Sequence, residues 1–285
     1  MKVPWSYPFK GVRPESIKAS EAICREVIKR SGCNQCSMAF SGGKDSVVTL
    51  ALLSQFFERV VPIYWYLIPN LSFVEEALTY YETVFGVSIN RLPHSDRFNV
   101  LFSNWIFQPP YRITALDTIM AETPFNFTMD DLVGEVRQLT GLDTLGSTGT
   151  GALHATGIRA SDSPTRAGIF RKHGGFGTNG LLFYPIITWN LNDVEAVLIH
   201  TGLKLSVEYQ WIGRSFDGIK RRYLECVREH YPADYQRIKD DFPLVDLEWF
   251  RAKINNVEGR IPLFKYQNVG QTPAPPKSKT QRRSR

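Results

Sequence analysis

The sequence predicts an α/β protein with a doubly wound, mostly parallel sheet and a helical C-terminal part. Apolar runs at residues 36–40, 60–68 and 87–92 have the length and composition of buried strands. Helical patterns lie between them, at residues 47–53 and 72–85. Strands that alternate with helices join into parallel sheets through right-handed crossovers, so this order indicates the doubly wound architecture.

Local signals mark where several helices begin and end. Pro14 stands at the favoured first position of a helix, and Gly32 ends that helix. Ser72 and Glu75 have the spacing of a capping box, which predicts that the second amphipathic helix begins there. Asn190 is predicted to cap a later helix.

The second half of the sheet is predicted from residues 152–156 and 181–187, which have the composition of a fourth and a fifth strand. Residues 94–126 are rich in aromatic residues and contain prolines that break any long helix, so we expect a partly helical insertion there. A further helix is expected at residues 128–138.

Length and composition indicate a soluble globular protein. The 285 residues can bury a sizeable core, and 43% are hydrophobic and 22% charged. We expect one main domain at residues 15–242, between an N-terminal extension (1–14), a C-terminal extension (243–270) and a disordered basic tail (271–285). No apolar run approaches the ~20 residues of a membrane span. The N-terminus lacks a signal-peptide core, so a cytoplasmic protein without membrane contact is expected.

Most of the net charge of +6 lies in the tail. Residues 271–285 contain five Lys or Arg residues and no acidic residue, which leaves about +1 for the rest of the chain. The stretch from Lys277 to Arg285 can attract nucleic acid or another acidic partner. A solubilising terminus without a specific partner is the alternative.

The most informative stretch is a glycine-rich turn between the first strand and the next helix. It consists of Ser41, Gly42, Gly43, Lys44, Asp45 and Ser46. Glycines let the backbone approach a ligand, the helix start presents unpaired N–H groups, and the serines and the lysine add donors for an anion. This predicts a phosphate-binding loop, with a plain serine-capped turn as the alternative. The loop differs from the Walker pattern in the residue after the lysine, and from the Rossmann turn in glycine spacing.

A second set of anion-binding residues follows the fourth predicted strand. Gly157 is followed there by Arg159, Ser163 and Arg166. Guanidinium groups pair bidentately with phosphate or sulfate, so arginines near the glycine-rich turn are predicted to form an anion clamp. An exposed arginine-rich loop without a ligand is the alternative.

Three segments resemble the phosphoadenosine-phosphosulfate (PAPS) reductase family of the PP-loop ATP pyrophosphatase superfamily, which includes the ATP sulfurylase small subunit. They are S-G-G-K-D-S at 41–46, T-G-I-R-A-S-D-S-P-T-R at 156–166 and Y-P-I-I-T-W-N-L-N-D-V at 184–194. The resemblance covers roughly residues 15–242. It implies a Rossmann-like adenine nucleotide alpha hydrolase fold in a PP-loop nucleotide-binding domain, and cleavage of ATP between the α and β phosphates.

The resemblance also implies a set of site residues. The nucleotide would contact Ser41, Gly42, Gly43, Lys44, Asp45, Ser46, Tyr66, Gly157, Arg159, Ser163 and Arg166, with the base near the strand end at Tyr66–Asn70. The implied catalytic residues are Lys44, Asp45, Arg159 and Arg166. Asp45 is the candidate for holding Mg2+ indirectly or orienting the loop; the alternative is an acid that complements the helix dipole.

The chain departs from sulfonucleotide reductases in its cysteines. Those enzymes carry a catalytic cysteine in E-C-G-x-H, whereas the nearest string here surrounds Cys226 in a helical pattern and lacks the glycine. Many relatives also carry a cysteine pair where this chain has residues 211–218, which contain none. We therefore expect no iron–sulfur cluster. Cys33 and Cys36 form a lone CxxC pair, interpreted as structural, with a redox pair as the alternative.

The preferred function is an enzyme that uses ATP and Mg2+ to adenylate an unknown acceptor, with release of pyrophosphate. The acceptor could be sulfate, a carboxylate or a nucleobase. A nucleotide-binding or sensing module that works with a partner subunit or as an oligomer is the alternative. A reductase that uses Cys33, Cys36 or Cys226 is the third hypothesis. His94 and His154 could serve in acid–base steps or be structural.

Overall fold

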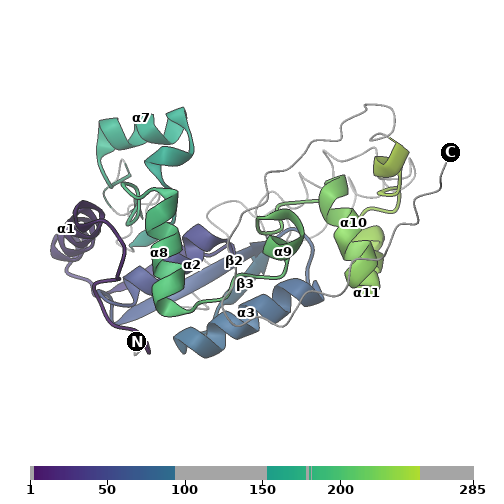
Figure 1. Ribbon diagram of the computed structural model, residues 1–285, viewed down its shortest axis with the longest axis horizontal. Coiled ribbons are helices and arrows are strands. Elements are labelled where there is room, and N and C mark those ends of the chain that lie inside the picture. Colours follow the sequence, from purple (N-terminus) through teal and green to yellow (C-terminus); the bar gives the residue numbers. More distant parts are fainter. Residues whose placement is uncertain (1–2, 94–152, 178–179, 181, 251–285) are drawn as a thin grey trace, which may run out of the picture.

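The computed structural model describes residues 3–93, 153–177, 180 and 182–250 (Figure 1). The predicted insertion at 94–126, the helix at 128–138, His94 and the basic tail lie outside the described residues. No helix in the described part of the chain is both long and apolar enough to cross a membrane.

Within the described residues, a five-stranded parallel sheet forms the centre of the fold and confirms the predicted doubly wound class. Its strands are β1 (Gln35–Ala39), β2 (Arg59–Tyr66), β3 (Asn90–Pro93), β4 (His154–Thr156) and β5 (Leu182–Phe183). Every neighbouring pair of these strands runs parallel.

The strand order is β3-β2-β1-β4-β5, so the chain winds outward from β1 in one direction and then in the other. The reversal opens a crevice beyond the carboxyl ends of β1 and β4, which is where ligands bind in such sheets. The glycine-rich turn follows β1, and the arginine-containing segment follows β4. The topology therefore brings together two segments that are more than a hundred residues apart in the chain.

Helices cover the sheet, and further helices lie beyond it at both ends of the molecule (Figure 1). They are α1 (Pro14–Ser31), α2 (Lys44–Leu53), α3 (Ser72–Phe85), α7 (Pro164–His173), α8 (Leu191–Thr201), α9 (Glu208–Ile212), α10 (Arg221–His230) and α11 (Pro232–Asp241). All residues of α2 from Ser46 to Leu53 are buried, because this helix lies within the core. Figure 1 shows α9, α10 and α11 together at one end, which is the predicted helical C-terminal part.

The predicted fifth strand at 181–187 is too long. Only Leu182–Phe183 pair with β4. The residues after them form turns, in which the Ile187 amide donates to the Tyr184 carbonyl and the Trp189 amide donates to the Ile186 carbonyl. Ile186 and Ile187 are completely buried, so the apolar run reflects a buried turn rather than a longer strand. Strand β3 is also shifted, to Asn90–Pro93 from the predicted 87–92.

One helix cap differs from the prediction and another confirms it. The N-cap of α3 is Leu71 without a side-chain cap; Ser72 Oγ donates instead to Asp234 of α11, 3.0 Å away. The predicted capping box of Ser72 and Glu75 is therefore wrong. At α8, Asn190 accepts from the Asp193 amide as predicted, and the Asp193 carboxylate accepts from the Asn190 amide in return.

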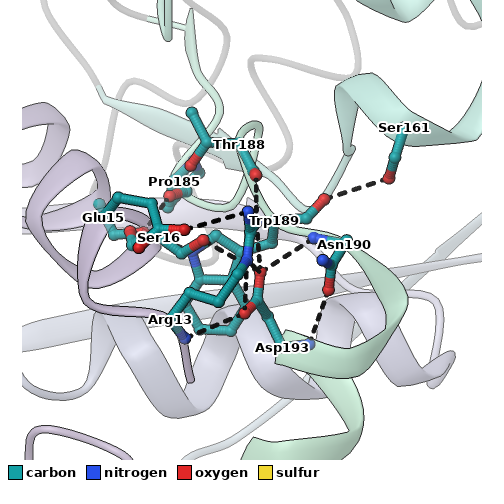
Figure 2. Close-up of polar contacts among 10 residues, drawn as sticks. Arg13, Glu15, Ser16, Ser161, Pro185, Thr188, Trp189, Asn190 and Asp193 are labelled. Atoms are coloured by element: carbon teal, nitrogen blue, oxygen red, sulfur yellow. Dashed lines mark hydrogen bonds and ion pairs between the residues drawn. The ribbon is translucent and has the colours of Figure 1, made fainter. Parts of the chain in front are cut away.

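The carboxylate of Asp193 joins the N-terminal segment to α1 and α8 (Figure 2). It is only 1% exposed and accepts from Arg13 Nη2 at 2.8 Å, Ser16 Oγ at 3.0 Å and the Asn190 amide at 3.0 Å. Burial alone would raise the pKa of Asp193, but these hydrogen bonds outweigh burial and hold it below the ordinary carboxyl value. The folded state is therefore stabilised by the ionised form of this group.

We predict that Asp193→Asn lowers the free energy of unfolding by about 2 kcal/mol, because the buried side chain loses its charge-assisted hydrogen bonds with Arg13, Ser16 and the Asn190 amide. Because the folded pKa is lowered, this stabilisation is present above the unfolded carboxyl pKa of ~3.9 and is lost as the pH falls through the lowered value. Urea denaturation at pH 7 and in the acid range measures both effects. Glu195→Gln on the same helix is the control. A variant as stable as the control at pH 7 would contradict the assignment.

Candidate functional site

A cavity of about 560 Å³ lies at the carboxyl ends of β1, β2 and β4. The residues that line it are Ala39, Phe40, Ser41, Gly43, Lys44, Asp45, Ser46, Tyr64, Trp65, Thr156, Gly157, Ile158, Arg166, Tyr209, Arg214, Ser215 and Phe216. This volume is within the range of small-molecule sites. The cavity therefore contains most of the glycine-rich turn, part of the segment after β4, and a third segment that follows α8.

The glycine-rich turn is held by its own serine hydroxyls. Ser46 Oγ donates to the Gly43 carbonyl at 2.8 Å, and the Gly43 amide donates to Ser41 Oγ at 3.3 Å. Gly42 has φ of +68°, a left-handed conformation that favours glycine. The result is a tight turn that presents hydroxyl and amide donors at the N-terminus of α2.

Lys44 and Asp45 face the cavity as an ion pair. Lys44 Nζ lies 2.7 Å from Asp45 Oδ2, and both side chains are mostly shielded from solvent. The backbone amide of Lys44 donates to the hydroxyl of Tyr209 at 2.8 Å. A neighbouring α9 side chain therefore occupies one of the amides that a helix N-terminus offers to an anion.

Arg159 lies behind the cavity wall and is only 6% exposed. Its Nη2 pairs with Asp162 at 2.5 Å, and its Nε lies 2.9 Å from Asp45 Oδ1 without hydrogen-bond geometry. It is not one of the residues that line the cavity. In this structure Arg159 acts on Asp45 and Asp162, and so holds the two loops together.

Arg166 does line the cavity, and its side chain is 41% exposed. Its Nη1 pairs with Asp162 Oδ2 at 2.7 Å. Ser163 is the N-cap of α7, because its hydroxyl accepts from the Arg166 amide. The structure therefore places one predicted clamp arginine at the cavity and gives the predicted serine a helix-capping contact.

Gly157 permits a close approach between the end of β4 and α2. A Cβ atom at this position would lie 2.6 Å from Thr49 Oγ1 and 3.0 Å from the Asp45 carbonyl oxygen. Since real Cβ contacts are almost never that short, any other residue here would push the strand away from the loop that carries Asp45.

The side of the cavity at β2 is aromatic. Tyr64 and Trp65 line it, whereas Tyr66, predicted to be near the base, ends the strand and is not among the lining residues. Desolvation raises the pKa of Tyr64, so its hydroxyl stays protonated. Aromatic faces of this kind can stack on a flat heterocycle.

Sequence reasoning missed the third wall, formed by Tyr209, Arg214, Ser215 and Phe216. These residues lie in and after α9 and share the cavity with Tyr64 and Trp65 of β2. The available signal in the sequence was the departure from the PAPS reductase resemblance at residues 211–218, which contain no cysteine.

The fit of Mg2+ to this site depends on Asp45. In the described part of the chain no three His, Cys, Asp or Glu side chains are grouped to hold a metal, and Asp45 is the acidic residue among those that line the cavity. Its Oδ1 lies 2.9 Å from Arg159 Nε and its Oδ2 lies 2.7 Å from Lys44 Nζ, so both carboxylate oxygens already face a cation. Since Mg2+ keeps several waters and uses one or two carboxylates together with substrate phosphates, Asp45 fits contact with the ion through water rather than direct ligation.

Three of the cysteines and His154 are buried or half-buried and lie away from the cavity lining. Cys24 and Cys36 are buried in the core, and desolvation raises the pKa of both thiols. Desolvation also raises the pKa of Cys226, to about 11. Burial lowers the pKa of His154 to about 4, and its Nδ1 lies 2.9 Å from Ser37 Oγ, so the ring is neutral. None of these residues is among those that line the cavity.

No protein-family model and no curated protein sequence matches this chain. Among solved structures, it is similar to the NH3-dependent NAD synthetase from Campylobacter jejuni in complex with the nitrate ion. The two chains share 15% identity over 87% of this chain and 97% of that one, with a TM-score of 0.38.

It is also similar to the PAPS reductase from Candida auris in its phosphate complex. The identity is 12% over 70% of this chain and 92% of that chain, with a TM-score of 0.40. This enzyme belongs to the family that the three sequence motifs resemble. Because both TM-scores are below 0.5, the chemistry of the site rests on the residues described above. Fold and site define an α/β protein with a glycine-rich loop and paired cations at the switch point of a parallel sheet.

The two clamp arginines are predicted to respond differently to substitution. Arg159→Gln should lower the free energy of unfolding by about 3 kcal/mol, because it leaves carboxylates without their buried partner. Arg166→Gln should change stability by less than about 1 kcal/mol, because its ion pair is partly exposed. Urea denaturation of both variants measures the difference. Equal small losses would contradict the structural role of Arg159.

Proposed function

We propose that the protein is a PP-loop enzyme that binds ATP and cleaves it between the α and β phosphates. The observation that carries this proposal is the glycine-rich loop at the N-terminus of α2, which lines a nucleotide-sized cavity together with Lys44, Arg166 and Arg214. A nucleophilic oxygen or nitrogen of the acceptor would attack the α-phosphorus. The bond to the bridging oxygen would break, pyrophosphate would leave with that electron pair, and the acceptor would lose its proton to solvent or pyrophosphate.

Charge stabilisation of the leaving group is the main task that these residues can perform. The lining residues carry three cations and one carboxylate, Asp45, so the cavity favours a polyanion. Preorganised donors in a shielded site stabilise developing charge more effectively than water does. Lys44 and Arg166 would contact the phosphates, and Arg159 would position Asp45 without touching the nucleotide.

Mg2+, when bound, would supply further neutralisation of the pyrophosphate charge. Asp45 is the residue that would hold it, through water. The predicted acceptors, namely sulfate, a carboxylate or a nucleobase, all remain candidates. The predicted contact of the tail with an acidic partner also remains part of the proposal.

A nucleotide-binding module that acts with a partner is the second candidate. The observation in its favour is that Asp45 is the one potential base among the described lining residues, and that it is already held by two cations. An acceptor that needs deprotonation would then require a group from another chain or from the acceptor itself.

Incubation of the full chain with ATP labelled at the α-phosphate tests the proposal. With Mg2+ and candidate acceptors, we expect labelled AMP or a labelled adduct together with pyrophosphate. The Lys44→Ala and Asp45→Ala variants should form at least ~10-fold less product, because removing one group that stabilises the transition state costs this much or more. If the wild-type protein binds ATP and forms no product with any acceptor, the binding-module hypothesis is favoured. If it does not bind ATP, the proposal fails.

Thiol chemistry has a separate test. Burial raises the pKa of Cys36 and Cys226, which disfavours their thiolates at neutral pH, and neither they nor Cys33 line the cavity. We therefore predict that Cys33→Ser, Cys36→Ser and Cys226→Ser each keep the wild-type activity within about twofold. Initial rates at matched folded protein concentration measure this. Loss of turnover in any folded variant would support the reductase hypothesis instead.

A further inference from the structure

The segment from Tyr209 to Phe216 is a wall of the cavity to which none of the sequence motifs assigns a role. It lies against the glycine-rich turn. A Cβ atom added to Gly43 would lie 3.1 Å from Ser215 Oγ and 3.4 Å from the Tyr209 hydroxyl. The Tyr209 hydroxyl already accepts the Lys44 amide at 2.8 Å. Hydroxyl groups from this segment therefore lie directly in front of the loop.

The segment is held in this place by contacts on its other side. The Tyr223 hydroxyl of α10 donates to the Ser215 carbonyl at 2.8 Å, and the rings of Phe216 and Phe73 pack at 5.6 Å between centroids. Trp211 stacks on His230 at 5.2 Å. These contacts fix the segment to α3 and α10, so its side chains are positioned before any ligand arrives.

The hydroxyl oxygen of Tyr209 accepts hydrogen bonds from two backbone amides. Burial raises the pKa of Tyr209 to about 12, and the amides of Lys44 and Ser215 oppose that rise by donating to its oxygen. Two backbone amides from separate elements thus converge on one point at the start of α2. The Tyr209 hydroxyl oxygen therefore ties the start of α2 to Ser215 and fixes the direction of the Lys44 amide.

Arg214 adds a cation on the same segment. It lines the cavity, and its side chain is 51% exposed. Its Nη2 pairs with Asp217 Oδ2 at 2.6 Å. Exposed ion pairs contribute little free energy, whereas a guanidinium binds phosphate bidentately, so Arg214 can exchange this partner for a phosphate group at small cost.

We propose that residues 209–215 form the second half of the phosphate site and bind the terminal phosphates of a nucleoside triphosphate. Arg214 and Ser215 contact the pyrophosphate portion, and Tyr209 is a positioning residue that sets the Lys44 amide. The ligand class is a nucleoside triphosphate or pyrophosphate; a nucleoside monophosphate lacks the pyrophosphate portion that these residues would contact. This inference rests on the proposed use of ATP.

Binding of three ligands to the full chain tests the inference. Arg214→Gln should raise the Kd for ATP and for inorganic pyrophosphate about 10- to 100-fold, which is the effect of losing a hydrogen bond to a charged group. The Kd for AMP should stay within about twofold of the wild-type value. Arg214→Lys should recover part of the loss. Arg221→Gln, whose partner is Glu225 outside the cavity lining, is the matched control. Thermal unfolding verifies that each variant is folded.

Tyr209→Phe keeps the ring and removes the hydroxyl. We expect faster hydrogen exchange at the Lys44 amide without nucleotide, and weaker ATP binding with unchanged AMP binding. If wild-type protein binds ATP but Arg214→Gln binds ATP, pyrophosphate and AMP as the wild type does, or weakens all three equally, the role of the segment is overturned while the proposed function stands. If the wild type binds neither ATP nor pyrophosphate, both proposals are overturned.

Discussion

The buried carboxylate of Asp193 is the group on which the arrangement of the site depends. A buried charge is tolerated only when it is paired and hydrogen-bonded, so Asp193 forces Arg13, α1 and the start of α8 to meet at one point. The turn before α8 is fixed in this way. Its carbonyls hold the segment after β4, because Ile187 accepts from the Ala160 amide at 2.7 Å and Trp189 accepts from Ser161 Oγ at 3.1 Å, the latter shown in Figure 2. A network outside the cavity thereby sets the place of Arg159.

Around the cavity, each cation is matched with an aspartate, but the pairs differ in burial. Lys44 pairs with Asp45, Arg166 with Asp162, and Arg214 with Asp217, and the two arginines are 41% and 51% exposed. Arg159, whose side chain is 7% exposed, lies between Asp45 and Asp162. A half-exposed arginine can move from its aspartate to a phosphate with little loss, whereas a buried one cannot. The fold thus separates a fixed cation that organises the loops from cations that are available to a ligand.

Local chemistry explains which features the sequence could predict. Pro14, Gly32 and Asn190 act through neighbouring residues, so the helix ends that they mark are where the pattern indicates. The position of the glycine-rich turn after β1 follows from the same kind of signal. The failures arise from distant partners: Ser72 donates to Asp234, and Tyr209 reaches Lys44 from 165 residues away. The prediction that Arg159 contacts the ligand came from its charge, which the sequence shows. Its ion pairs with Asp45 and Asp162 depend on the fold, so the sequence could not show them.

The way in which the loop satisfies its own donors determines what a ligand must replace. In the folded chain the amides of Ser41 and Gly43 donate to the hydroxyl oxygens of Ser46 and Ser41, while Tyr209 holds the Lys44 amide in place. The serine hydroxyls are neutral acceptors, so a phosphate oxygen that takes their place gains charge-assisted bonds and separates no ion pair. A carboxylate at the same amides would bind them more strongly and would repel the phosphates. The hydroxyl-lined loop therefore stays ordered without a ligand and retains its preference for an anion.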